Sequence, residues 1–154
     1  MQLNKIIFIL SLFVSYLTLG QTHQWAESLN SKETINALAV SVDKKHNSYI
    51  VARFADTLFI GKNDFVHKSS YSNSFDGYLA RFTPEGKLSW CNTIYTKGNS
   101  TVRLSNVKVI NSNKILIYGI FSFTSPNAVL MLSKTNSIVN KSKSSVSKGF
   151  IANY

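Results

Sequence analysis

A strand-turn-strand pattern occurs twice in this chain of 154 residues. The segment INALAVSVDKKHNSYIVARF, which begins at Ile35, is echoed by VRLSNVKVINSNKILIYGIF, which begins at Val102. The first strands match at an offset of 67, and after a one-residue gap the stretch 49–51 corresponds to 115–117. Alternating apolar residues on either side of a polar turn are typical of a β-hairpin with one buried face. Each copy is therefore predicted to begin with an antiparallel strand pair.

A third strand follows the hairpin in each copy. SFDGYLARF (74–82) matches VSKGFIANY (146–154), and this match places Gly77 on Gly149. In the first copy the turn TPEG, which ends at Gly86, comes next and has Pro and Gly at tight-turn spacing. The second copy ends where this turn would begin.

The fourth strand of the pattern carries a tryptophan. SWCNTI (89–94) follows the turn, and QWAESL (24–29) resembles it, so Trp25 and Trp90 are predicted to share one repeat position and a packing role. Units of four short antiparallel strands that recur every 65 to 72 residues are typical of β-propeller blades. The predicted fold class is all-β, with four-stranded antiparallel blades in an incomplete propeller.

These matches divide the chain into four parts. We expect a signal peptide at 1–20, an outer-strand-like segment at 21–33, a first blade-like repeat at 34–95 and an incomplete second repeat at 96–154. Roughly three or more repeats are needed for a stable repeat architecture, because a single repeat cannot bury its hydrophobic face alone. The chain is therefore expected to be a piece of a longer propeller, with further blades in the same or another chain.

The N-terminal residues have the three parts of a secretory signal: Lys5, an apolar run over 6–19, and the small residue Gly20. Cleavage after Gly20 would start the mature chain at Gln21 and place it outside the cell or at the cell surface. A membrane anchor is the alternative, but the run is shorter than the roughly 20 residues of a transmembrane helix. No second apolar run follows it, so no membrane span is expected after cleavage.

Composition and charge limit the partners. Only two prolines occur and β-branched and aromatic residues are frequent, which favours strands. Cys91 is the only cysteine, so we interpret it as a packing residue and expect no intrachain disulfide. All Asp and Glu residues lie within residues 1–85, and the basic remainder indicates either a solvated face or contacts to an anionic partner. The candidate contact residues are Lys108, Lys114, Lys141 and Lys143.

The sequence lacks a pattern for catalysis or for a cofactor. His23, His46 and His67 do not have zinc-ligand spacing, and Asp56 and Asp64 lack the glycine-punctuated acidic loop of a calcium site. No nucleophile elbow, phosphate loop or dinucleotide fingerprint is present. Interleaved arginines and aromatics that would stack bases are also missing, so nucleic acid is not an expected partner.

The segment DGYLARFTPEGKLSW resembles the Asp-Ala-Phe-Val-Ala-Lys-Leu-Asp, turn, Gly, Trp segment of the β-propeller repeat called SBBP, found in many exported bacterial proteins. The spacing of Asp76, Gly77, Gly86 and Trp90 is the most distinctive part of the match. INALAVSVDKKHNSYIVARF resembles the other half of that repeat. The second copy of this half, which begins at Val102, has the glycine of the family pattern at Gly119.

The departures from the family concern one Gly, one Asp and two joins. Arg53 stands where the family usually has Gly, and Gly119 is its match in the second copy. Lys148 replaces the Asp that Asp76 matches, and the joins 61–73 and 122–146 are irregular. The resemblance implies a non-catalytic exported propeller. With the signal peptide and the missing catalytic set, it favours a scaffold or recognition module that binds a protein or glycan at the cell surface. Two alternatives stay open: a fragment of a propeller enzyme whose catalytic residues lie in other blades, and a module that binds anionic polymer.

Overall fold

The computed structural model describes residues 25–61, 65–69, 74–97, 100–111, 113–123, 128–139 and 146–154. These residues form twelve strands and no helix, and every strand pairing among them is antiparallel, which confirms the all-β prediction. The predicted signal peptide at 1–20 lies outside the described residues.

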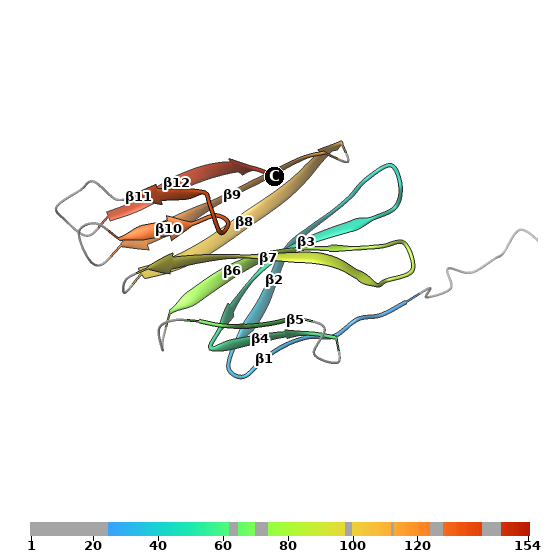
Figure 1. The fold of residues 1–154 in the computed structure, drawn as a ribbon, viewed down its shortest axis with the longest axis horizontal. Coiled ribbons are helices and arrows are strands. Elements are labelled where there is room, and N and C mark those ends of the chain that lie inside the picture. Colours follow the sequence, from blue (N-terminus) through green and yellow to red (C-terminus); the bar gives the residue numbers. More distant parts are fainter. Residues whose placement is uncertain are drawn as a thin grey trace, which may run out of the picture.

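The largest sheet has six strands in the order β11-β10-β7-β6-β3-β2 and forms the middle layer of the molecule (Figure 1). We call it the middle sheet. Its strands β2, β3, β6 and β7 form one antiparallel run that corresponds to the four strands expected for residues 34–95. The strand bounds are β2 (Ile35–Val42), β3 (Ser48–Ala55), β6 (Phe75–Phe82), β7 (Leu88–Lys97), β10 (Val129–Met131) and β11 (Ser137–Val139).

Two three-stranded sheets cover the middle sheet, one on each face (Figure 1). The second hairpin and the last strand form the sheet β12-β9-β8, made of β8 (Ser100–Asn111), β9 (Lys114–Phe123) and β12 (Val146–Asn153). The other sheet has the order β1-β4-β5, made of β1 (Leu29–Ser31), β4 (Thr57–Ile60) and β5 (Phe65–Lys68). The sequence did not predict this small sheet.

Two hydrophobic clusters hold the three layers together. Between the middle sheet and β12-β9-β8, the middle sheet contributes Val51 and Leu79 to a cluster that includes Leu104 of β8. On its other face, the middle sheet packs Phe54 and Tyr78 against β4. Successive side chains of a strand point to opposite faces. The central strands β3 and β6 are therefore apolar on both sides.

The two hairpins share one register and one irregularity. Ile35 of β2 pairs with Phe54, and Val102 of β8 pairs with Phe121, 67 residues further along in both partners. The pairing shifts within β2 between residues 37 and 39 and within β8 between residues 104 and 106, so a β-bulge falls at the same place in each copy. The repeat is thus present in the backbone as well as in the sequence.

The one-residue gap that was predicted in the alignment of the two hairpins is wrong. Ser48 pairs with Val42, and Ile115 pairs with Val109, so the offset stays at 67 through the second strand. Residue 119 consequently matches Ala52 and not Arg53. The prediction failed because β3 is apolar on both faces, so an apolar triplet from β9 can be matched to β3 in either register.

The third strands also occupy corresponding places. Gly77 pairs with Arg53 and Gly149 pairs with Ile120, and these two partners are again 67 residues apart. The strand β12 has no fourth strand beside it among the described residues, whereas β6 is followed by β7.

The two tryptophans lie in different places, contrary to the prediction that they share a repeat position. Trp25 precedes β1, lies outside any strand, and stacks on Phe82 with ring centroids 6.0 Å apart. It also covers Gly86, whose φ of +80° and missing Cβ leave room for the indole. Trp90 lies in β7 and packs edge-on against Tyr49 in the opposite cluster. The match rested on a tryptophan among small residues, which does not specify a strand.

The irregular joins contain additional strands. β5 lies in the first join, and the hairpin of β10 and β11 lies in the second. β10 pairs with β7 and extends the outer edge of the middle sheet, with Leu130 fully buried. β10 covers three residues of a five-residue apolar run, 128–132, inside a Ser- and Lys-rich stretch, and this run was too short to be identified as a strand.

Candidate interaction surface

The sheet β12-β9-β8 has one covered face and one uncovered face. Strand alternation turns Ile117 and Phe121 toward the middle sheet, where both are buried, and turns the residues between them outward. On the outward side Tyr118 is 47% exposed, Ile120 44% and Ile151 76%. We call this surface, turned away from the middle sheet, the open face. Large apolar side chains grouped on one exposed surface mark interaction sites more often than scattered ones do.

The open face contains a shallow, wide-open depression of about 660 Å³ with a largely apolar lining. Its floor includes the strand backbone at Gly149, where an added Cβ atom would meet nothing closer than the Gly119 carbonyl oxygen at 3.9 Å. The space above Gly149 is therefore free to accept a side chain from outside. The depression is lined by Ser105, Tyr118, Gly119, Ile120, Gly149, Phe150 and Ile151.

Two side-chain hydrogen bonds cross between neighbouring strands on the open face. The Asn106 side-chain amide donates to the Tyr118 hydroxyl at 3.3 Å. The hydroxyls of Ser122 and Ser147 hydrogen-bond to each other across β9 and β12 at 2.7 Å. These bonds link neighbouring strands and leave the apolar groups between them exposed.

Cationic side chains lie along the β8 side of this apolar surface. Arg103 and Lys108 of β8 and Lys114 at the start of β9 are all exposed. No Asp or Glu follows Glu85 in the sequence, so nothing acidic in this sheet offsets them. Of the four lysines predicted to contact an anionic partner, Lys108 and Lys114 thus lie exposed on this sheet. The other two, Lys141 and Lys143, lie outside the described residues.

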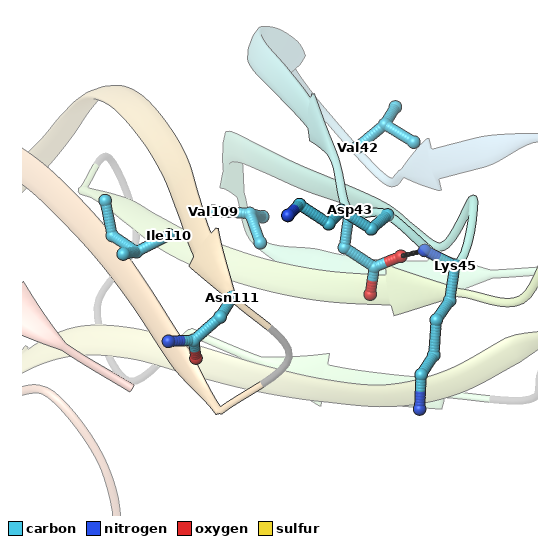
Figure 2. Close-up of a pocket in the computed structure, with 7 residues that line it drawn as sticks. Val42, Asp43, Lys45, Val109, Ile110 and Asn111 are labelled. Carbon is cyan, nitrogen blue, oxygen red and sulfur yellow. Dashed lines mark hydrogen bonds between the residues drawn. The ribbon is translucent and has the colours of Figure 1, made fainter.

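A second cavity, of about 360 Å³, lies where the ends of β2 and β8 meet (Figure 2). There the Val109 amide donates to the Ser41 hydroxyl at 3.2 Å and ties the two strands together. Figure 2 shows residues around this cavity and marks the hydrogen bond from the Lys45 backbone amide to the Asp43 carboxylate. The lining residues are Val42, Asp43, Lys44, Lys45, Val109, Ile110 and Asn111.

The only carboxylate at this second cavity, that of Asp43, is already engaged by its own turn. One oxygen accepts from the backbone amides of Lys45 at 2.8 Å and Asn47 at 2.9 Å. The other accepts from the Asn47 side chain at 2.8 Å and the Tyr49 hydroxyl at 3.1 Å. Burial raises the pKa of Asp43, but these hydrogen bonds outweigh it and lower the pKa below its ordinary value. Asp43 therefore holds the turn and is not free for a ligand.

A histidine and an aspartate meet between the small sheet and the middle sheet. His67 Nε2 of β5 lies 3.7 Å from the buried Asp76 carboxylate, and its ring contacts Phe54 and Tyr95. The nearby Tyr78 hydroxyl is buried without a hydrogen-bond partner in the described part of the chain, and burial raises the pKa of Tyr78 far above its usual range. Through these contacts the His67 side chain joins β5 of the small sheet to β3, β6 and β7 of the middle sheet.

The single thiol is suited to packing. Cys91 lies at the edge of the cluster on the small-sheet side of the middle sheet. Burial raises its pKa to about 12, so the thiolate, which is the reactive form, is scarce at neutral pH.

The remaining candidate ligands are dispersed. His46 is exposed in the turn after β2, and Asp56 lies between β3 and β4, each with a positive φ. His23 and Asp64 lie outside the described residues. Within the described ranges, no group of three or more His, Cys, Asp or Glu side chains could hold a metal ion. In the same ranges, no helix has the length and hydropathy needed to cross a membrane.

Comparisons with protein-family models, with curated proteins and with solved structures find no match to this chain. The features of the molecule that bear on its function are therefore its open face and its internal repeat.

The sequence did not identify the open face. Its signal was the alternation in β9, where apolar residues occupy both faces of a strand that has a partner sheet on one side only. The mistaken gap aligned Ile117 with Val51. With the offset of 67 that the structure shows, the residue that corresponds to Val51 is Tyr118.

Proposed function

We propose that this protein is a non-catalytic, exported β-repeat protein of the SBBP propeller kind, which serves as a scaffold or recognition module at the cell surface. The observation that carries the proposal is the open face: an apolar sheet surface, left uncovered, at one end of three stacked antiparallel layers. Stacked sheets that present an apolar face are suited to binding other macromolecules. The signal-like N-terminus and the repeat in the sequence support export and the repeat family.

The proposal is tested by following the full-length chain in a bacterial host. Export predicts that the protein leaves the cytoplasm and that mass spectrometry finds Gln21 as the first residue. Retention in the cytoplasm with Met1 or Gln2 at the N-terminus contradicts it. Exported protein is then screened against immobilised glycans and surface-protein fractions, with an Ile151→Lys variant as the matched control. Binding that the variant abolishes supports a recognition role for the open face.

A second candidate function rests on the exposed cations near the open face. Arg103, Lys108 and Lys114 have no acidic neighbours in their sheet, which is the charge pattern of a surface that attracts anionic polymer. Such binding weakens steeply with salt. Retention on an anionic polysaccharide column that falls between 50 and 200 mM salt, by the order-of-magnitude changes expected of several ionic contacts, favours this function. Elution in the void at low salt excludes it.

A further inference from the structure

We infer that the open face docks a further antiparallel β-sheet from a partner, and that this sheet seats a leucine-sized side chain over Gly149. The inference rests on the proposed scaffold function and names the partner of its open face. It follows from the internal repeat, because the corresponding face of the first copy is already covered within this chain.

The same pair of positions is buried in one copy and exposed in the other. In the middle sheet, Val51 pairs with Leu79, and both side chains are fully buried beneath the sheet β12-β9-β8. The corresponding pair in the second copy is Tyr118 and Ile151, which are also directly paired. These two are 47% and 76% exposed. The second copy therefore presents the face that the first copy buries.

A specific contact shows how that face is filled in the first copy. An added Cβ atom at Gly77 would lie 2.8 Å from Cδ1 of Leu104, because this leucine sits directly over the glycine. Leu104 stands just before the bulge of β8 and is buried. Gly77 is thus a socket, and Leu104 is the side chain that fills it.

The corresponding socket in the second copy is empty. Gly149 stands at the place of Gly77, and its nearest neighbour in the direction of a Cβ atom is the Gly119 carbonyl oxygen at 3.9 Å. Gly149 lines the shallow depression of about 660 Å³ on the open face. The geometry accepts an aliphatic side chain delivered from a strand that lies over the open face.

A second copy of this chain does not supply the required sheet. The residue of the first copy that corresponds to Leu104 is Ala37, which is too small to fill the socket. The face of the middle sheet that would have to dock is also already covered by β4, through the buried Leu58 and Ile60.

Charge also opposes pairing of two open faces. Such a pair would bring the exposed Arg103 and Lys108 of both copies together, and the sheet has no acidic residue to separate them. The partner is therefore a sheet of a different sequence, with a leucine-sized residue before a bulge and with no cation on the side that faces Arg103 and Lys108.

The test uses the one hairpin whose fit to such a socket is visible in this structure. A head-to-tail cyclised peptide of residues 100–123 presents Leu104 and its bulge, and it is titrated into the full-length protein with a fluorescent label on the peptide turn. We expect saturable binding. Replacement of Leu104 by Ala in the peptide, or Gly149→Val in the protein, should weaken binding at least tenfold, because a central packed contact of an interface is lost.

Matched controls separate loss of the docking contact from misfolding and from a general effect of an added valine. Gly149 has no positive φ and an open Cβ position, so the Val variant should keep the fold; near-ultraviolet circular dichroism checks this. Ser137→Val, on the exposed strand β11, adds a valine away from the open face and should leave binding unchanged. Binding that Gly149→Val does not alter, or no binding at all, overturns the inference.

Sedimentation of the full-length protein supplies the remaining outcome. A monomer at micromolar concentration agrees with a partner of a different sequence. A dimer that Gly149→Val dissociates shows that a second copy occupies the face and overturns the partner assigned here. Peptide binding does not depend on where the protein is located, so a failure of export would contradict the proposed function and leave this docking result unaffected.

Discussion

At the scale of single residues, the turn after β2 depends on one carboxylate. Asp43 accepts four hydrogen bonds from three residues, so Asp43→Ala should lower the free energy of unfolding by about 2 kcal/mol. Tyr49→Phe removes one of these bonds and should cost about 1 kcal/mol. Urea unfolding at pH 7 measures both changes. Equal effects of the two substitutions would show that the backbone bonds to Asp43 contribute nothing.

The same carboxylate predicts a pH dependence. Its folded-state pKa is lowered from the ordinary value of 3.8, so its stabilising effect is complete above that value and is lost as the pH falls through the folded-state pKa. The stability difference between the native protein and Asp43→Ala should therefore narrow below about pH 3.8. Unfolding curves collected from pH 7 to pH 2.5 check this; a difference that widens toward low pH would reverse the assigned sign.

His46 in this turn occupies a backbone conformation that favours glycine. Its φ of 62° lies in the left-handed region, which costs a side-chain-bearing residue about 1 kcal/mol. His46→Gly removes that cost but adds freedom to the unfolded chain, so we expect a net stabilisation of at most about 1 kcal/mol. His46→Ala keeps a Cβ atom and serves as the control, with no gain expected. Thermal unfolding of the three proteins compares them directly.

At the scale of elements, two glycines in neighbouring strands should respond differently to the same change. An added Cβ atom at Gly119 would lie 2.5 Å from the Arg103 carbonyl oxygen, which is backbone and cannot move aside locally. Gly119→Ala should therefore destabilise the protein by about 1 to 3 kcal/mol, as overpacking does. Gly149→Ala has open space and should be close to neutral. Denaturant unfolding of both variants tests the pair, and equal losses would show that β9 does not approach β8 as closely as described.

Strands were predictable from the sequence to the extent that one face of each was polar. The alternation in β2 and the Asp- and Asn-rich turn after it predicted the first hairpin. Register was not predictable where a strand is covered on both faces, because β3 has no polar side to fix the alignment. The short strands β4 and β10 have too few residues for a period. They are defined only by the tertiary structure, in which β4 is buried against the middle sheet and β10 pairs with β7 inside it.

The open face was hidden for a related reason. A sequence shows that Tyr118 and Ile151 are apolar residues of strands, but their exposure depends on which layer ends the stack. That is a property of the tertiary arrangement, and the apolar residues on both faces of β9 do not by themselves say which face stays uncovered.

At the scale of the whole molecule, the stacking order predicts a gradient of local stability. The strands β3 and β6 lie inside the middle sheet, have a partner strand on each side, and are covered on both faces. The strand β12 has one partner strand, β9, and one exposed face. Amides that open only by global unfolding exchange slowest, whereas edge strands open locally. Hydrogen exchange followed by mass spectrometry should therefore find the slowest amides in β3 and β6 and faster exchange in β12. Uniform exchange across these strands, or protection of β12 equal to that of β6, would contradict the layer order. If a partner sheet docks on the open face, as inferred above, adding the cyclised hairpin should slow exchange in β12 and β9 and leave β3 unchanged, because β12 and β9 line the surface around Gly149 and gain cover there.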